Sequence, residues 1–557
     1  MTRSNRFFFL MTCALSIVMI CFYIRALYPI YLFPIYPDEV AERLALSRMV
    51  YDFPIRTNLM PMCKAMPQYY SKIWYFPSSI EWLLHGQIYN LKNFRVISIV
   101  SSWLVFLLLT MKLCKKNLAA FDRPNQKRMF IIIALGLVLA LLQVGVVPFF
   151  LITLRSEQTI LILLMIICLL FSEPTERSSK KIIMSLSYFM CVSLLLYLHP
   201  KTLLLVPILL IVAWRLFSRF NNKYIFTGLF FALTAIIFAN YYLRLATLDC
   251  SNSIEVSQML SGFSINFSNI IKNPTQFLHD LQYNLSDYKI EIDRISFQSI
   301  AQVNYLPPIT MSRKLVWMNT LITINYWAIF FFTLTSGIVF YVRDLIKHKK
   351  IVTDHLLVLV ILGCAVINVS INQCKNWYDA GFLWSLLVIA FIILIANHLP
   401  FLLKRMYFYV VICYFLLFGT ASLYFLIQRY EPPLKEGFYG PSISLVKYDY
   451  DSINNELSKL ASLCHIDVKK AQNLIIDDLT YFYFQKNKYP LAYSYLFYGN
   501  DRSFLHQFLN KFNPGGIVVR STTLPAPLIE KYAIKRGEFI CVPKENLTLL
   551  FKEILKN

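Results

Sequence analysis

The chain has 557 residues, of which 57% are hydrophobic and 15% charged, and its formal net charge at pH 7 is +23. Apolar runs of about 20 residues, the length that a helix needs to cross ~30 Å of hydrocarbon, recur over the first three quarters of the chain. This pattern excludes a soluble globular protein. The basic residues gather in short loops between the apolar runs, as the positive-inside rule predicts, so the charge does not indicate nucleic-acid binding.

The apolar runs in chain order predict a polytopic α-helical membrane protein of about 11 transmembrane helices. Basic residues cluster at alternate ends of these runs, which places the N-terminus in the cytoplasm and the C-terminal tail outside it. We expect the inner (plasma) membrane of a bacterium. The candidate spans are 7–24, 95–113, 129–149, 155–172, 182–198, 202–217, 224–243, 318–342, 352–372, 380–397 and 406–427.

This topology leaves two long loops, 25–94 and 244–316, and the tail on the outer face. We expect a membrane module at 1–428 and an extracytoplasmic domain at 429–557, joined by the linker YEPPLKEGFYGP. Short β-like runs alternate with helical stretches in the tail, which predicts a small α/β domain with a mainly parallel sheet. The predicted strands are 473–478, 516–520 and 538–542, and the predicted helices lie near 451–463, 502–511, 525–535 and 545–556.

Cysteines carry little information along most of the chain, because none forms a C-x-x-C pair and no spacing indicates a zinc site. Cys464 and Cys541 fall in the tail, where an oxidising compartment would permit a disulfide. Whether the two pair stays open.

An acidic pair opens the first outer loop. Asp38 and Glu39 stand in FPIYPDEVAERL and precede a helical pattern. Taken alone, the pair is typical of helix capping, because carboxylates stabilise the free N–H groups of a first turn. At a membrane edge, a carboxylate is also suited to act as a general base on an acceptor hydroxyl. We take Asp38 as the candidate base, with Glu39 positioning the acceptor or holding a cation.

Charged residues also mark the outer ends of later spans. Arg155 and Glu157 stand in LRSEQ, where a structural ion pair and a functional site are both reasonable, because charges near hydrocarbon are costly. The turn YLHPKT carries His199 and Lys201 on the same side. Snorkelling of the Lys201 side chain to the interface is the alternative to a functional role.

These cations together predict an anion site at the outer face, because Lys and Arg bind phosphate through charge-assisted hydrogen bonds. We expect the anion to be the phosphate of a lipid carrier. No metal is required, although Glu39, Glu157 and His199 could build a site for a divalent cation. The predicted cations are Arg155, His199 and Lys201, with Lys72, Arg95, Arg25 and Arg244 on the same side.

The second outer loop contains a predicted helix at 285–299. A solvated helical face explains its charged residues, and direct catalysis is the alternative. A long loop beside a site is also a candidate lid. The charged residues are Asp287, Glu291, Asp293 and Arg294.

The order of these motifs resembles the GT-C superfamily of membrane glycosyltransferases, most closely the branch that contains protein O-mannosyltransferases and the bacterial aminoarabinose transferase of lipid A. The acidic pair, the later stretch SKIWYFPSSIEWLLHGQIYNLKNFRVISIV, LRSEQ and YLHPK carry the likeness. Within the long stretch, Lys72 and Arg95 occupy positions comparable with a Lys and an Arg of that branch. The likeness covers roughly Phe7 to Trp214. Ile73-Trp74 replaces the branch's Pro-Pro, and the tail matches no family domain.

The resemblance implies a hexosyl- or pentosyltransferase whose donor is a sugar on a polyprenyl phosphate and whose acceptor is a lipid-linked, glycan or protein molecule. The implied reaction is an inverting displacement in which Asp38 takes the acceptor proton. Arg155 and Lys201 would stabilise the departing phosphate, since offsetting charge on a leaving group is a large catalytic term. Lys72, Arg95 and the neighbouring lipids would help to bind the donor.

Three other functions compete with this one. A polymerase or ligase of lipid-linked glycans would centre on arginines in later loops, such as Arg294. A transporter or flippase would carry polar residues in mid-span and related halves, whereas the mid-spans are mostly Leu, Ile and Phe and no internal repeat is evident. A scaffold that displays the tail would tolerate loss of Asp38 and Glu39.

Overall fold

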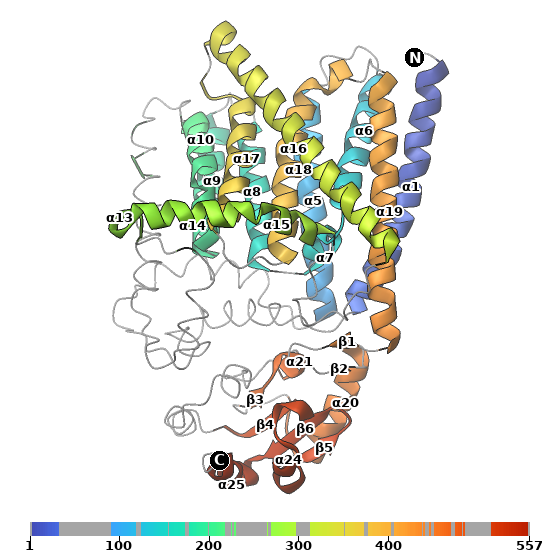
Figure 1. Ribbon diagram of the computed structural model, residues 1–557, viewed down its shortest axis with the longest axis vertical. Coiled ribbons are helices and arrows are strands. Elements are labelled where there is room, and N and C mark those ends of the chain that lie inside the picture. The colour runs from blue at the N-terminus through green and yellow to red at the C-terminus, as the bar shows by residue number, and fades with distance from the viewer. Residues whose placement is uncertain are drawn as a thin grey trace.

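A bundle of long helices and a smaller C-terminal domain make up the computed structural model (Figure 1). The residues that the structure describes are 3–32, 91–117, 124–153, 155–172, 178–198, 200–217, 224, 228–229, 265, 269–296, 312–349, 351–371, 377–402, 406–436, 438–439, 445–446, 450–468, 474–481, 483–484 and 514–554.

The bundle helices run alternately up and down between two ends, one of which faces the C-terminal domain and is here named the C-domain end (Figure 1). Six of the described helices are long and apolar enough to cross a membrane. Every predicted run except 224–243 falls on one described helix or on two consecutive ones, and 224–243 lies almost wholly outside the described residues, so the count of eleven stays a prediction. The helices are α1 Arg3–Leu32, α5 Leu91–Asn117, α6 Pro124–Leu142, α7 Val147–Ile152, α8 Ser156–Ser172, α9 Ser178–Leu198, η5 Pro200–Leu205, α10 Val206–Phe217, α16 Arg313–His348, α17 Asp354–Ile371, α18 Trp377–Leu402 and α19 Met406–Glu436.

Helix α18 forms the centre of the bundle. Its whole apolar window is buried inside the protein, whereas only 17% of the α1 window is. A helix that is hydrophobic on all sides must be covered on all sides, which is why the α18 sequence shows no polar face. Its Trp384 is fully buried, and the indole Nε1 donates a hydrogen bond of 2.7 Å to the carbonyl oxygen of Leu141 in α6.

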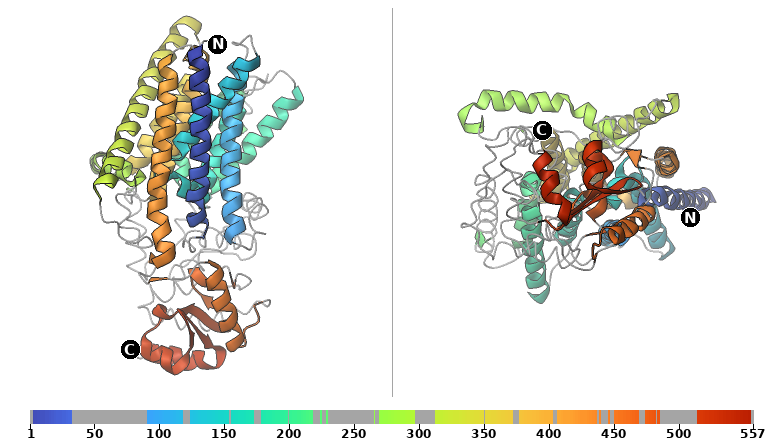
Figure 2. Two further views of the ribbon diagram at one scale, coloured as in Figure 1. Left: turned by 90° about the vertical axis from the view of Figure 1, so that its right-hand side faces the viewer. Right: turned by 90° about the horizontal axis from the view of Figure 1, so that it is seen from below.

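Helices α1 and α19 lie side by side along the bundle (Figure 2). Both are longer at the C-domain end than their sequences predicted: α1 continues from the expected end at 24 to Leu32, and α19 from 427 to Glu436. The two extensions support each other, because Arg25 of α1 pairs with Glu431 of α19 at 3.3 Å. The expected linker therefore begins as a helix that includes Pro432.

The predicted run 129–149 is divided between α6 and α7. Gly145 adopts a left-handed φ of +56°, and a Cβ built there would lie 1.8 Å from the carbonyl oxygen of Ile295. No other residue fits this turn. A second glycine, Gly381 of α18, lets Phe150 of α7 approach, since a Cβ at 381 would lie 2.8 Å from the Phe150 side chain.

A helical segment crosses the side of the bundle instead of running along it (Figures 1 and 2). It consists of α13 Asn269–Lys272, α14 Pro274–Ser286 and α15 Tyr288–Ile295, so the helix predicted around 285–299 is present as α15 and begins three residues later than expected. The helical path breaks at Asp287, which ends α14 and precedes α15. The expectation of a solvated face was wrong for two charges: Glu291 and Arg294 are buried, 1% and 7% exposed, because α15 packs on α18 and α16.

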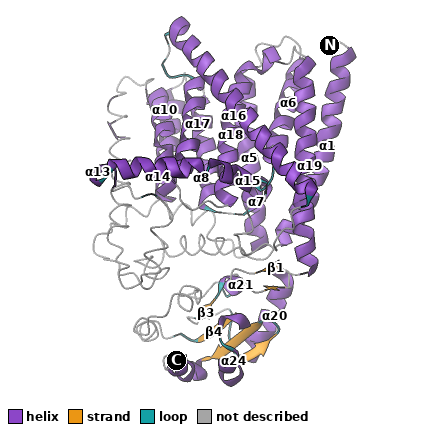
Figure 3. Cartoon of the chain, viewed as in Figure 1, coloured by secondary structure: helices purple, strands orange, loops and turns teal. Residues whose placement is uncertain are grey.

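The C-terminal domain carries all the strands of the described residues (Figure 3). Its four-stranded sheet has the order β3-β4-β6-β5, and only the β3–β4 pair is parallel, so the expected mainly parallel sheet was wrong. The short β5, which follows α24 directly and returns beside β6, was not predicted. The elements are β1 Phe438–Tyr439, β2 Leu445–Val446, α20 Tyr450–Leu463, β3 Ile475–Ile476, α21 Asp478–Tyr481, β4 Gly516–Arg520, η7 Ser521–Thr523, α24 Ala526–Tyr532, β5 Ile534–Arg536, β6 Phe539–Pro543 and α25 Lys544–Ile554.

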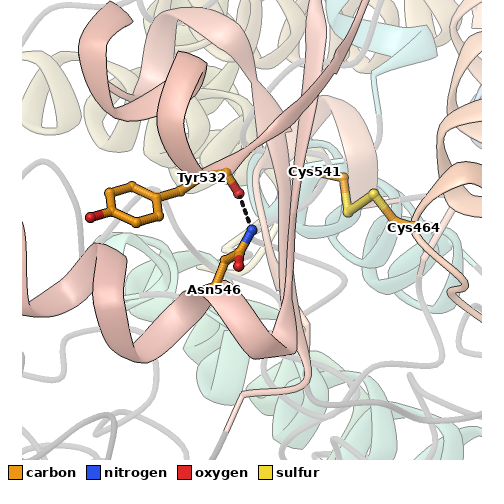
Figure 4. The surroundings of a disulfide bond; sticks show 4 residues. All are labelled: Cys464, Tyr532, Cys541 and Asn546. Carbon is orange, nitrogen blue, oxygen red and sulfur yellow. Dashed lines mark hydrogen bonds between the residues drawn. A yellow bond between two sulfur atoms is a disulfide. The ribbon is translucent and has the colours of Figure 1, made fainter.

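A disulfide between Cys464 and Cys541 joins the end of α20 to the buried strand β6 (Figure 4). It answers the question that the sequence left open. Nearby, Asn546 donates a hydrogen bond of 3.0 Å from its side-chain amide to the carbonyl oxygen of Tyr532, which fastens α25 to the end of α24 (Figure 4).

The domain lies beyond the C-domain end of the bundle (Figure 2). An ion pair between Lys92, near the start of α5, and Asp451, in the first turn of α20, links the two parts. The Lys92 ammonium also lies 5.8 Å from the ring centre of Tyr31 in α1.

Candidate functional site

Half of the predicted site can be placed. Arg95, Arg155, Glu157 and Lys201 belong to the part of the chain that the structure describes. The expected base and its neighbour, with three of the expected cations, lie outside the described residues, and their roles stay predictions; these are Asp38, Glu39, Lys72, His199 and Arg244.

Three chain segments meet at the C-domain end of the bundle to form a charged cluster. Arg155 and Glu157 stand at the start of α8, Lys201 lies in η5 between α9 and α10, and Asp379 lies in the first turn of α18. First turns favour carboxylates because their free N–H groups and the helix dipole stabilise negative charge. Arg155, Glu157, Lys201 and Asp379 together form the outer cluster.

The outer cluster is held by direct ion pairs. Arg155 Nε lies 3.1 Å from Glu157 Oε2, and Lys201 Nζ lies 3.3 Å from Glu157 Oε1. Lys201 also pairs with Asp379 Oδ1. The predicted ion pair between Arg155 and Glu157 is therefore present. The snorkelling alternative was wrong for Lys201, because two buried carboxylates bind its ammonium and its side chain is only 16% exposed.

An aromatic ring supports both cations. The guanidinium carbon of Arg155 lies 3.5 Å from the ring centre of Tyr378, and the Lys201 ammonium lies 5.2 Å from it. A cation over a ring face is attracted by the ring quadrupole, by about 2 kcal/mol when the pair is desolvated. Tyr378 itself is oriented by its neighbour Trp377, whose ring packs against Phe149 of α7 at 4.6 Å between centroids.

The charges of the outer cluster balance, with two cations and two carboxylates. Burial alone would lower the pKa of Lys201, but the attraction of Asp379 and Glu157 outweighs burial and raises that pKa above its usual value. Lys201 is therefore a cation at neutral pH.

Helix α5 holds the start of α8 in place. The side-chain amide of Gln158 donates to the carbonyl oxygen of Ser98 at 3.1 Å and to the hydroxyl of Ser102, while the Ser98 hydroxyl donates to Leu151 of α7 at 3.0 Å. Gln158 is fully buried beside Glu157. These bonds fix the position from which Glu157 reaches the two cations.

Arg95 and Arg25 contact neighbouring helices, and their expected part in an anion site stays a prediction. Arg95 is 1% exposed and donates from Nη1 to the carbonyl oxygens of Ile30 and Tyr31, both at 3.1 Å, so it caps the last turn of α1. Arg25 pairs with Glu431, and its side chain is 65% exposed. The contacts of these two arginines thus join helices, and the structure does not bring them into the outer cluster.

No group of three His, Cys, Asp or Glu side chains among the described residues is arranged to hold a metal ion. The cation site expected from Glu39, Glu157 and His199 includes two residues outside the described ranges and stays a prediction.

Sequence reasoning missed Asp379 and Tyr378. Their signal is visible in hindsight in NWYDAGFLW: an acidic residue opens an apolar run at the predicted outer face, the pattern that singled out Glu157. The sequence does not show that Asp379 contacts Lys201, because the two residues are 178 positions apart in the chain.

No protein-family model matches the chain, and no curated protein matches it in sequence. Among solved structures, ArnT from Cupriavidus metallidurans bound to undecaprenyl phosphate is 11% identical, with 97% of this chain and 98% of that chain covered and a TM-score of 0.43. ArnT in the apo state is likewise 11% identical, with 95% and 98% covered and a TM-score of 0.40. The apo oligosaccharyltransferase of Archaeoglobus fulgidus is 11% identical, with 90% and 69% covered and a TM-score of 0.37.

Proposed function

We propose that the protein is a membrane glycosyltransferase that moves a sugar from a polyprenyl-phosphate donor to a lipid-linked, glycan or protein acceptor at the outer face of the membrane. The observation that carries this proposal is the outer cluster: four charged side chains from three segments, three of them buried and Lys201 partly buried, gathered at one end of an apolar bundle. Charges buried in such a setting are costly and are usually retained for binding or transport.

The chemistry of the outer cluster suits a lipid phosphate. Lys201 and Arg155 supply charge-assisted N–H donors, and the headgroup of a membrane lipid reaches the end of a helical bundle without leaving its leaflet. During transfer the phosphate regains negative charge as the sugar–oxygen bond breaks. Cations already in place lower the barrier to that step, because they need no reorganisation.

The two carboxylates also have a role in this proposal. Without a ligand, Glu157 and Asp379 balance the two cations, which keeps them charged and oriented in a buried place. A bound phosphate would share those cations. Asp38, from the first outer loop, would take the proton of the acceptor hydroxyl in an inverting displacement.

The proposed orientation puts the C-terminal domain in the periplasm of a bacterium and the N-terminus in the cytoplasm. Two observations support it. The domain contains the Cys464–Cys541 disulfide, which is typical of an oxidising compartment. The N-terminus lies at the opposite end of the bundle, as does the last part of α16, in which Arg343 and Lys347 are exposed (Figure 1).

The proposal is tested with the full-length protein in nanodiscs, given radiolabelled polyprenyl-phosphate sugars and lipid or glycan acceptors. Lys201→Ala should reduce transfer at least 100-fold, and Asp38→Asn should abolish turnover while donor binding persists. Lys459→Ala, which removes an exposed lysine of α20, is the matched control. Wild-type rates in both Lys201→Ala and Asp38→Asn would contradict the proposal.

The same assay separates the competing functions. A polymerase or ligase predicts that Arg294→Ala abolishes activity and Asp38→Asn does not. A flippase predicts movement of the lipid between leaflets without any new glycosidic bond.

A further inference from the structure

One carboxylate oxygen of the outer cluster is left over. Both oxygens of Glu157 contact cations, since Oε2 faces Arg155 and Oε1 faces Lys201. Asp379 uses only Oδ1, which pairs with Lys201. Its Oδ2 is buried and accepts no hydrogen bond from any described residue. The whole Asp379 residue is only 4% exposed.

A buried charged oxygen without a donor is unfavourable by about 1–3 kcal/mol or more. Proteins seldom leave such an atom unpaired unless a ligand or an ordered water completes it. The missing partner must be a hydrogen-bond donor, because a carboxylate oxygen can only accept. A neutral donor fits better than a second cation, since the charges of the cluster already balance.

We infer that Asp379 Oδ2 accepts a hydrogen bond from a hydroxyl of the sugar carried by the donor lipid. This inference rests on the proposed function, and it names Asp379 as the residue that recognises the sugar. Lys201 relates the phosphate of the ligand to its sugar. A phosphate bound at Lys201 would hold the attached sugar beside Asp379, because the Asp379 carboxylate pairs with the same Lys201 ammonium.

Position along the helix agrees with this role. Asp379 is in the first turn of α18, the helix at the centre of the bundle, and Gly381, two residues further on, lets α7 pack tightly. The carboxylate is therefore fixed by a rigid element. Because the acceptor is already fixed, forming this hydrogen bond costs little entropy beyond that of the hydroxyl. A fixed acceptor therefore favours sugars whose hydroxyl stands at the matching position of the ring.

The test compares two lipids on one protein. Binding of undecaprenyl phosphate, which lacks a sugar, and of undecaprenyl phosphate carrying glucose or mannose is measured on the full-length protein in nanodiscs. In Asp379→Asn, an amide N–H replaces Oδ2 while the other oxygen still accepts from Lys201. We expect the sugar-bearing lipid to bind about 10-fold or more weakly, since a hydrogen bond to a charged group is lost. Binding of undecaprenyl phosphate should change only as much as in Glu157→Gln, because both variants remove one negative charge beside Lys201, and its persistence also shows that the variant folds.

Glu157→Gln is the matched control, because it removes charge from the same cluster without touching the free oxygen. It should change the binding of both lipids by the same factor. Deoxy sugars locate the hydroxyl: the analogue that lacks it should bind wild type and Asp379→Asn equally well. Equal weakening of both lipids by Asp379→Asn, or no effect on either, would overturn the inference and leave the proposed function standing. Failure of wild type to bind either lipid would overturn the proposed function itself.

Discussion

Two buried clusters of carboxylates and cations can be compared in this protein. In the C-terminal domain, Asp477 and Arg520 are each 2% exposed. Asp477 Oδ2 accepts from the backbone N–H and Nε of Arg520 at 2.9 and 3.2 Å, and Oδ1 accepts from the backbone N–H and hydroxyl of Thr480, both at 3.0 Å. In the outer cluster, Asp379 is as deeply buried and one of its oxygens has no donor among the described residues.

The difference shows that burial and charge do not by themselves mark a functional site. The Asp477 carboxylate ties the end of β3 to α21 and to the end of β4, so its bonds are complete within the fold. The Asp379 carboxylate pairs with Lys201, which is distant in sequence, and its Oδ2 still lacks a donor among the described residues. An incomplete set of hydrogen bonds is what a ligand can use.

The largest effect on stability should come from breaking the complete cluster. Asp477→Ala leaves the buried Arg520 guanidinium without the carboxylate that pairs with it. We expect the free energy of unfolding of the C-terminal domain to fall by about 3–5 kcal/mol. Thermal unfolding followed by near-UV circular dichroism measures this. Binding of undecaprenyl phosphate by the bundle should persist; its loss would mean that the two clusters are not independent.

Removing the disulfide should weaken the same domain by somewhat less. The crosslink closes a segment of 77 residues in sequence, and replacing Cys464 and Cys541 by Ser should lower the stability of the domain by about 2–5 kcal/mol. Resistance to protease with and without a reducing agent reports the change. If reduction leaves wild type as resistant as before, the bond contributes no stability.

An apolar replacement sharpens the comparison further. Lys201→Met with Asp379→Leu removes a buried charged pair, so the bundle should stay as stable or gain about 1–4 kcal/mol, while lipid-phosphate binding is lost. The equivalent exchange in the domain, Arg520→Met with Asp477→Leu, should destabilise it, because backbone N–H groups of Arg520 and Thr480 lose their acceptor. Opposite results in the two places would reverse the assignment of roles.

The smallest effect is expected at the other end of the bundle. Arg215 of α10 pairs with Asp354 of α17 at 2.6 Å, with side chains 22% and 12% exposed. Partly exposed pairs contribute little, so Arg215→Gln should cost about 0.2–1 kcal/mol and leave transfer unchanged. Denaturation midpoints and the transfer assay check both statements, and a large loss of transfer would show that this pair belongs to the working machinery.

Much of the bundle was predictable because membrane helices follow from composition. The strand 516–520 and the helices at 155–172 and 182–198 appear within a few residues of their predicted limits. The errors arise where tertiary contacts override local signals. Ile295 approaching Gly145 divides α6 from α7, and the α1–α19 pair extends both helices beyond their apolar runs.

The candidate site was predictable only in part for the same reason. Arg155, Glu157 and Lys201 stood out because charge at a membrane edge is rare. Nothing local distinguishes Asp379 from a first-turn acidic residue of any helix, and nothing local shows that Arg95 caps α1. Both roles depend on which helices become neighbours.

The unbroken length of α19 has a mechanical consequence. Its 31 residues measure about 46 Å at about 1.5 Å per residue, well above the ~30 Å of hydrocarbon, so the helix projects from the bilayer as a stiff strut. One alanine inserted into the projecting part would lengthen the helix by about 1.5 Å and turn the residues after it by about 100°. The number of residues in α19 therefore sets where the helix ends above the hydrocarbon and in which direction the chain leaves it.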